Sequence, residues 1–330
     1  MKRIILFTLV LVLALSLCAC RDRKEAEQTA AEPTAAPTPV PTPEPTPAEV
    51  ITAAMDANNG IESAHISVSF EFAMSRQSDG QEGTMLLTAD NSAFYAQIEA
   101  DFTKSPYVLK GTLRLRLSGD DSTAPQEVPF CLWQEDGAFY AAYAYDAGGN
   151  ETWMGSRVNT EGMLSTGADP DLSQVLEQYR TLLCDWAETF EETGKLTVNG
   201  ETATAYTAQI DGEMMRKWLE TYKDENGEPM LTFTDELIKE LPPIAVTIAI
   251  DANGMPVYQE IDAAAFVSKL LERIIYSQLA EEGESFALDT LLIKQTVSDV
   301  NAVGPIEIPE DIQIYDYSTA MPGISAFLGA

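Results

Sequence analysis

Histidine and cysteine are the residue types that most often carry nucleophilic catalysis or bind zinc, and both are scarce in this chain. His65 is the only histidine in 330 residues, and it stands at the start of a stretch of alternating polarity. A serine–histidine or cysteine–histidine arrangement would have to use this one side chain, yet its position at the end of a strand favours an exposed residue. Zinc sites built from histidine and cysteine lack ligands here. We therefore predict that the protein is not an enzyme and has no catalytic residue, metal site or cofactor.

Acidic residues are plentiful, but their spacing does not indicate a binding site. The chain has 52 Asp and Glu against 20 Lys and Arg, which gives a formal net charge of -32. The segments "SGDDST" and "DENGEP" lack the ligand spacing of a calcium loop. A carboxylate pair for glycoside hydrolysis would be compatible with this composition, but no spacing singles one out. The charge predicts a domain that repels nucleic acid and anionic lipid surfaces, so we expect no nucleic-acid partner.

Cysteine chemistry is more informative at the N-terminus, where residues 1–19 have the pattern of a signal peptide. Two basic residues precede an apolar run that is shorter than the about 20 residues of a membrane-spanning helix. Cleavage before Cys20 places the small Ala19 before the cut, whereas cleavage before Cys18 places Leu17 there. The motif "LCAC" resembles a bacterial lipobox, and Cys20 is the predicted lipid attachment site. The alternatives are a secreted protein cut nearby and an uncleaved membrane anchor.

Residues 20–47 combine the lipidated cysteine with a stalk rich in Pro and Thr. Such a composition favours extended polyproline II rather than a folded domain. Arg21, Arg23 and Lys24 would lie beside the lipid headgroups. A diacylated cysteine anchors stably, so we expect the chain to be held on the extracytoplasmic face of the cell membrane. The remaining residues, 48–330, are predicted to form the folded domain.

Two kinds of periodicity divide this domain into strands and helices. The stretch "HISVSFEFAMS" alternates strictly and places Ile66, Val68, Phe70 and Phe72 on one face, and "YVLKGTLRLRLSG" does the same for Leu113 and Leu115. This alternation is typical of half-buried antiparallel strands. Asp-Gly at 136–137 and Asn-Gly at 199–200 and 253–254 predict hairpins.

Helical spacing marks the segments between these hairpins. Residues 47–59 predict a short amphipathic helix, and residues 169–190 predict a longer one that carries Tyr179, Leu183 and Trp186 and stops near Gly194. Shorter helices are expected at 212–223 and 234–241, and another at 263–281. The sum is an α+β domain in which helices cover one face of an antiparallel sheet.

The order of these pieces resembles a known group of proteins. The lipobox, the stalk and a helix leading into "GIESAHISVSFEF", followed later by "IAVTIAIDANGMPVYQEID" and "VSDVNAVGPIEIPEDI", are similar to LolA-like envelope lipoproteins of the LppX and LprG type. Gram-positive lipoproteins of unknown function look most similar. The resemblance covers about residues 48–313. It implies a curved antiparallel β half-barrel with helices covering the concave face, where many members hold a lipid or acyl chain. The helix at 263–281 is long for the simplest members.

An alanine-rich strand, "GAFYAAYAY", could leave room for such a ligand beside Phe139 and Tyr143, between this strand and a facing helix around Tyr179, Leu183 and Trp186. The alternative is that the alanines let a helix lie close to the sheet. The candidate cavity residues are Ile66, Val68, Phe70, Phe72, Leu113, Leu115, Phe139, Tyr143, Tyr179, Leu183 and Trp186. Outside the signal segment only Cys131 and Cys184 remain; they could form a disulfide or stay as two separate thiols.

These observations favour a non-enzymatic, membrane-anchored extracytoplasmic lipoprotein that binds a hydrophobic ligand, a lipid or acyl chain, for transport, presentation or sensing. The alternative is an envelope interaction or stress-sensing module with a filled core and a protein partner instead of a ligand.

Overall fold

The computed structural model describes residues 44–78, 91–117, 126–146, 151–157, 181–219, 233–273 and 284–315. Its strands are β1 (Ser63–Ser78), β2 (Asn91–Lys104), β3 (Tyr107–Leu117), β4 (Gln126–Glu135), β5 (Ala138–Asp146), β6 (Glu151–Arg157), β7 (Glu191–Val198), β8 (Glu201–Ile210), β9 (Ile244–Ile250), β10 (Pro256–Asp262), β11 (Glu284–Ser298) and β12 (Gln313–Tyr315).

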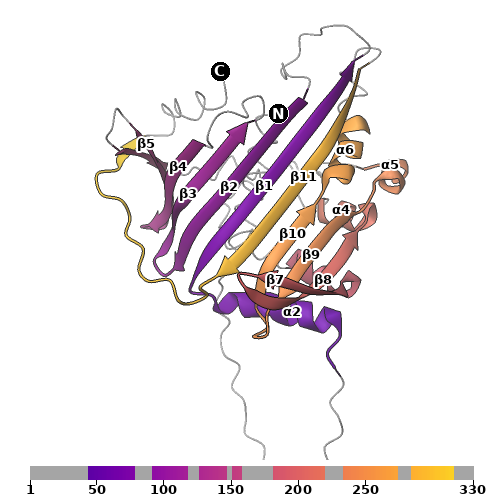
Figure 1. Ribbon diagram of the computed structural model, residues 1–330, viewed down its shortest axis with the longest axis horizontal. Coiled ribbons are helices and arrows are strands. Elements are labelled where there is room, and N and C mark those ends of the chain that lie inside the picture. Colours follow the sequence, from indigo (N-terminus) through magenta and orange to yellow (C-terminus); the bar gives the residue numbers. More distant parts are fainter. Residues whose placement is uncertain are drawn as a thin grey trace, which may run out of the picture.

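All of these strands belong to one open sheet, in the order β12-β6-β5-β4-β3-β2-β1-β11-β10-β9-β8-β7 (Figure 1). Neighbouring strands run antiparallel except β12, which lies parallel to β6. The two longest strands, β1 and β11, pair at the centre although they lie far apart in the sequence. The fold is therefore α+β with a predominantly antiparallel sheet that does not close into a barrel, as predicted.

The helices are short and gather on the β7–β11 half of the sheet (Figure 1). They are α2 (Pro47–Ala57), η1 (Asn58–Gly60), η3 (Ala187–Thr189), α4 (Gly212–Leu219), α5 (Asp235–Glu240) and α6 (Ala264–Leu271), with one further helical turn over residues 181–185. A capping box starts α2, since the Thr46 hydroxyl accepts from the Glu49 amide at 3.3 Å and the Glu49 carboxylate accepts from the Thr46 amide at 2.7 Å. No helix among the described residues is long and apolar enough to cross a membrane.

Strand register divides the side chains between two faces. Val68 pairs with Ile98, which pairs with Leu113, so these residues share the face on which the helices pack. We call this the inner face. His65 and Ser67 lie on the other face, which we call the outer face, and they pair with Asp101 and Glu99 of β2. The alternation expected for β1 and β3 is confirmed.

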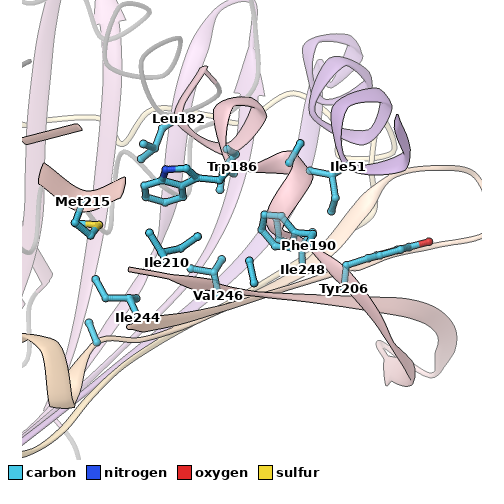
Figure 2. Close-up of a cluster of buried hydrophobic side chains, with 14 of the residues drawn as sticks. Ile51, Leu182, Trp186, Phe190, Tyr206, Ile210, Met215, Ile244, Val246 and Ile248 are labelled. Atoms are coloured by element: carbon cyan, nitrogen blue, oxygen red, sulfur yellow. The ribbon is translucent and has the colours of Figure 1, made fainter. Parts of the chain in front are cut away.

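The helix-covered half of the inner face is a filled core. Trp186 and Phe190 pack with the strand residues Ile210 and Ile248 (Figure 2), and Leu183 belongs to the same cluster. Ile51 of α2, Ile210 and Ile248 have 0%, 0% and 1% of their surface exposed. This half leaves no surface for a guest at those positions.

Hairpin turns form where the Asp-Gly and Asn-Gly pairs predict them. Asp136 and Gly137 have φ of 50° and 76°, and Asn199 and Gly200 have φ of 51° and 84°, as a type I′ turn requires. The third turn, at Asn253-Gly254, is longer. In it the Asp251 carboxylate accepts hydrogen bonds from the amides of Asn253 and Met255 at 2.9 and 2.8 Å.

The helix expected over residues 169–190 ends earlier than predicted, and residues before 181 lie outside the described residues. The Thr189 hydroxyl donates to the Trp186 carbonyl at 2.7 Å, which tightens the chain into the 3₁₀ turn η3. Gly194 does not stop a helix. It lies in β7 with φ of 135°, beside a bulge between Glu192 and Gly194. The predicted 263–281 helix is described as α6 and two further residues, and the rest of it lies outside the described residues.

Candidate ligand-binding face

The inner face of β1–β5 gathers most of the predicted cavity residues. Phe70 pairs with Ala96, which pairs with Leu115, so β1, β2 and β3 present one continuous row. Phe130 pairs with Tyr143 and so extends the same face to β5. Ile66, Val68, Phe70, Phe72, Leu113, Leu115, Phe139 and Tyr143 thus share one face of five neighbouring strands.

Burial on this face falls along the strands. Ile66 and Val68 have 4% and 2% of their surface exposed, whereas Phe70 and Phe72 further along β1 are half-buried. The buried end is closed by a small cluster that includes Phe102. Leu113, Leu115, Phe139 and Tyr143 are half-buried as well. The face is therefore packed on β1 and β2 around Ile66 and Phe102, and it offers part-exposed apolar surface further along β1 and β3 and across the sheet on β5.

Aromatic side chains run across this surface from strand to strand. The ring centroids of Phe70 and Phe94 lie 5.9 Å apart, and those of Phe102 and Tyr107 5.5 Å apart. Tyr107 in turn meets Phe139 of β5 edge-on, with centroids 5.4 Å apart. Such rings offer large apolar area at low conformational cost. Their chemistry suits dispersion contacts with an apolar molecule.

Sequence reasoning missed part of this surface. Phe94 and Phe102 on β2, Tyr107 on β3 and Phe130 on β4 also belong to the inner face, as their pairing with neighbouring strands shows. The alternation in "NSAFYAQIEADF" carried the signal, but the parity of one strand relative to the next becomes readable only once the register is known.

The alanine-rich strand β5 serves both faces. Ala141 pairs with Leu132 and lies on the inner face between Phe139 and Tyr143. Ala142 lies on the outer face with 3% of its surface exposed, in a cluster with Cys131 and Trp133. Close approach of another element does explain some of the alanines, but that element is the C-terminal segment on the outer face rather than a helix.

That C-terminal segment, residues 303–315, runs from the lower end of β11 along the side of the sheet to β6 (Figure 1). Ile306 and Ile312 pack on the outer-face cluster of Val108, Cys131, Trp133 and Ala142. The Lys110 ammonium donates to the Glu307 carbonyl at 2.9 Å. The part of the outer face of β3–β6 around Cys131 is consequently buried.

Leu183 and Trp186, expected to face the alanine-rich strand, lie elsewhere. They belong to the filled core beside β8 and β9, with 2% and 8% of their surface exposed. Phe139 and Tyr143 are not members of that cluster. Tyr179 and the predicted lipid attachment site Cys20 lie outside the described residues.

The two remaining cysteines are separate thiols, and the disulfide considered from the sequence is not formed. Cys131 packs under the C-terminal segment, whereas Cys184 packs against the helix-covered core. Burial raises the pKa of Cys131 to about 11, with the nearby Lys110 charge opposing the shift, so the reactive thiolate is suppressed.

His65 takes part in a polar network on the outer face. Its Nδ1 lies 2.8 Å from Asp101 Oδ1 and its Nε2 3.1 Å from Glu99 Oε2, while the Ser67 hydroxyl donates to Glu99 at 2.7 Å. Burial lowers the pKa of His65, but the hydrogen bonds with Asp101 and Glu99 outweigh it, so the pKa is raised overall. When protonated, His65 forms an ion pair with two carboxylates of the neighbouring strand β2.

No protein-family model and no curated protein matches this chain. Among solved structures, the chain is similar to the lipoprotein LppX of Mycobacterium tuberculosis, at 15% identity over 79% of this chain and 97% of that one, with a TM-score of 0.36. It is also similar to LprF of Mycobacterium bovis, at 14% identity over 82% and 99% of the two chains, with a TM-score of 0.38. A β-barrel-like protein of unknown function from Brucella abortus shares 10% identity over 72% and 97%, with a TM-score of 0.21. The resemblance to lipoproteins of the LppX type that the sequence predicts is matched by structural similarity to two of them, at low sequence identity.

Proposed function

We propose that this chain is a membrane-anchored extracytoplasmic lipoprotein that holds a hydrophobic ligand, a lipid or an acyl chain, on the inner face of β1–β5. One observation carries the proposal: beyond its packed part this face is apolar and only half-buried, whereas the other half of the same face is filled by the protein's own helices. From Ile66 to Phe72 the inner-face residues of β1 and their partners in β2 and β3 are all apolar or glycine. Covering such a surface with an apolar molecule is energetically favourable.

The driving force would be hydrophobic. Removing apolar surface from water is favourable by about 25 cal/mol per Å², less the cost of ordering the ligand. The aromatic rings of Phe70, Phe94, Tyr107 and Phe139 provide broad contacts. Because the inner-face side chains of these strands bring no charge to the centre of this surface, we expect selectivity for chain length and shape rather than for a charged headgroup.

The anchor would place this domain outside the cell membrane. The first described helix, α2, begins at Pro47, directly after the predicted stalk. Intact-mass measurement of the mature N-terminus tests the anchor, with Cys20 as the expected first, acylated residue. A Cys20→Ser chain should lose the lipid and leave the membrane fraction, while a Cys18→Ser chain should behave as the wild type. Persistent lipidation of the Cys20→Ser chain would refute this site.

Native mass spectrometry of the intact chain purified from its own membrane tests the ligand. We expect a co-purified mass adduct that organic extraction identifies as a lipid or fatty acid. Titration of the stripped protein with fluorescent fatty acids and phospholipids should then show saturable binding. If no lipid class binds saturably, the ligand proposal fails, and an interaction module with a protein partner becomes the better reading.

A further inference from the structure

A recess lies on the outer face, away from the proposed lipid surface. It is a groove of about 280 Å³ over β7–β10, lined by Thr193, Thr207, Thr247, Tyr258 and Glu260, with Gly194 and Ala205 among its smaller residues. Thr207 and Thr247 alternate along their strands with Tyr206, Ala208, Val246 and Ile248, which belong to the helix-covered core. The groove therefore opens on the opposite side of the sheet from that core.

Hydroxyl groups form a row across three strands of this groove. Thr193 Oγ1 lies 3.2 Å from Thr207 Oγ1, and Thr207 Oγ1 lies 3.0 Å from Thr247 Oγ1. Each hydroxyl has one donor and two acceptor positions, so these mutual contacts leave acceptor capacity unused. In register with Thr247, Glu260 of β10 continues the row with a carboxylate.

The local backbone gives this row its depth. Gly194 of β7 has φ of 135° and stands beside a bulge in the pairing with β8. A Cβ built on Gly194 would have no heavy atom within 4 Å. Ala205, its partner on β8, adds only a methyl group. Bulges often bend a strand away beside functional positions, and here the bend accompanies a recess rather than a flat sheet surface.

Charge in the groove is balanced. The Glu260 carboxylate accepts from the Tyr258 hydroxyl at 2.6 Å and lies 3.4 Å from the Lys294 ammonium. The Lys195 ammonium is engaged by the Thr204 hydroxyl at 2.6 Å. A free anion would meet a carboxylate here, and a calcium ion would find one carboxylate where it takes six to eight oxygen ligands. A neutral ligand rich in hydroxyl donors meets neither obstacle.

We propose that this groove binds one neutral saccharide unit, with the row of Thr193, Thr207, Thr247 and Glu260 accepting hydrogen bonds from its hydroxyls. Tyr258 supplies an aromatic side chain to the same lining, against which the C–H surface of a sugar ring can pack. The volume lies near the lower end of small-molecule sites, about 300 Å³, which suits a single ring and not an acyl chain. The site lies on the opposite face from the proposed lipid surface, so the two proposals can fail separately.

Threonine methyl NMR on the full-length chain in detergent micelles tests this site. The probes are glucose, mannose and N-acetylglucosamine, with inorganic phosphate and putrescine as charged comparisons. We expect at least one sugar to shift the methyl signals of Thr193, Thr207 and Thr247 saturably. Thr247→Val should weaken that binding about tenfold, as expected for the loss of one hydrogen-bonding group. Thr193→Val, at an exposed position of β7, gives a second variant should Thr247→Val not fold.

Thr202→Val is the matched control, because Thr202 is exposed on the same strand as Thr207 and pairs with Thr197 rather than lining the groove. It should leave sugar binding unchanged. The proposal is overturned if none of the three sugars gives a saturable shift, if only phosphate or putrescine does so, or if Thr202→Val weakens binding as much as Thr247→Val. Fatty-acid binding should be the same in all of these variants.

Discussion

Replacing Ala141 by Trp separates a ligand-binding face from a filled core. Ala141 lies on the inner face between Phe139 and Tyr143 and is half-buried, opposite Leu132 of β4. If this surface accommodates a guest, the indole should occupy the guest's place and leave the fold intact. Ala142 is the matched control, because it is the next residue and points to the other face, where 3% of its surface is exposed.

The expected magnitudes differ between the two positions. At Ala142 the indole meets the cluster of Cys131 and Trp133 under Ile312, and overpacking of this kind costs about 1–3 kcal/mol. For a domain of this size each kcal/mol lowers Tm by about 2–4 °C, so Ala142→Trp should melt roughly 2–12 °C lower. Ala141→Trp without ligand should melt within about 2 °C of the wild type, less than 1 kcal/mol on the same scale.

Ligand then provides the second measurement. A fatty acid at 100 times its Kd stabilises the binding-competent protein by about 2.7 kcal/mol, which is roughly 5–11 °C in Tm on the same scale. The wild type and Ala142→Trp should show this rise, and Ala141→Trp should not. Calorimetric melting of the three chains, with and without fatty acid, measures both effects. The reasoning is refuted if Ala141→Trp melts as low as Ala142→Trp while the wild type gains nothing from any lipid, because that result describes a filled core.

Three further predictions concern stability and reactivity. His65→Gln should destabilise the fold by less than about 1 kcal/mol at pH 5 and by less at pH 8 than at pH 5. The reason is that a raised pKa contributes stability that is complete well below the unfolded-state pKa of about 6.5 and is lost as the pH rises through the folded-state pKa. Denaturant melts at both pH values check this, and an equal loss at pH 8 contradicts it. Cys131 should resist iodoacetamide at pH 8 in the intact chain and should react faster in Ile312→Ala, because this change loosens the C-terminal segment that covers the thiol. Peptide mass mapping measures both rates. Equal rates would contradict the idea that this segment shields Cys131. Gly111→Ala should lower the free energy of unfolding by about 3 kcal/mol or more, because the added Cβ would stand 2.6 Å from a Cα of the neighbouring strand. A Cβ added at Gly60 meets nothing within 4 Å, so Gly60→Ala should melt as the wild type does. A similar loss of stability in both variants would contradict the steric argument.

Local patterns in the sequence were sufficient for most of the strands and for two of the hairpin turns. Alternation in β1 and β3 reported which side chains share a face, because the period of a strand is two and any slip would bury Ser67 or Glu71. Asp-Gly and Asn-Gly pairs reported two turns, because few other residues accept positive φ at both positions. The helix over residues 47–59 was expected from its amphipathic spacing, and the structure adds the capping box of Thr46 and Glu49 at its start.

Long-range pairing was not readable in the same way. The periodicity around Leu183 and Trp186 shows that one side of the helix is apolar, but it does not say which strands that side meets. The structure places these residues against β8 and β9 instead of the alanine-rich β5. The groove between β7 and β10 was missed for a similar reason, because its hydroxyls come from three strands that only the register brings together. Likewise, the carboxylates that hold His65 come from a strand about 35 residues further along the chain.

The placement of covering elements explains how one sheet could present two unlike surfaces. On the β8–β9 side, helices bury the inner face around Ile210 and Ile248, which leaves the outer face with its row of threonine hydroxyls. On the β3–β5 side, the C-terminal segment buries the outer face around Cys131, and the inner face with Phe139 and Tyr143 stays half-buried. Each half thus has one face packed by the chain itself, which supplies stability, and one face that remains available. The helices and the C-terminal segment cover opposite faces of the sheet, so the two faces left uncovered differ in character. The uncovered inner face of the β3–β5 half is apolar, and the uncovered outer face of the β8–β9 half is polar. An apolar and a polar ligand could therefore be bound on the two sides of the same sheet without either site removing the packing that supports the other.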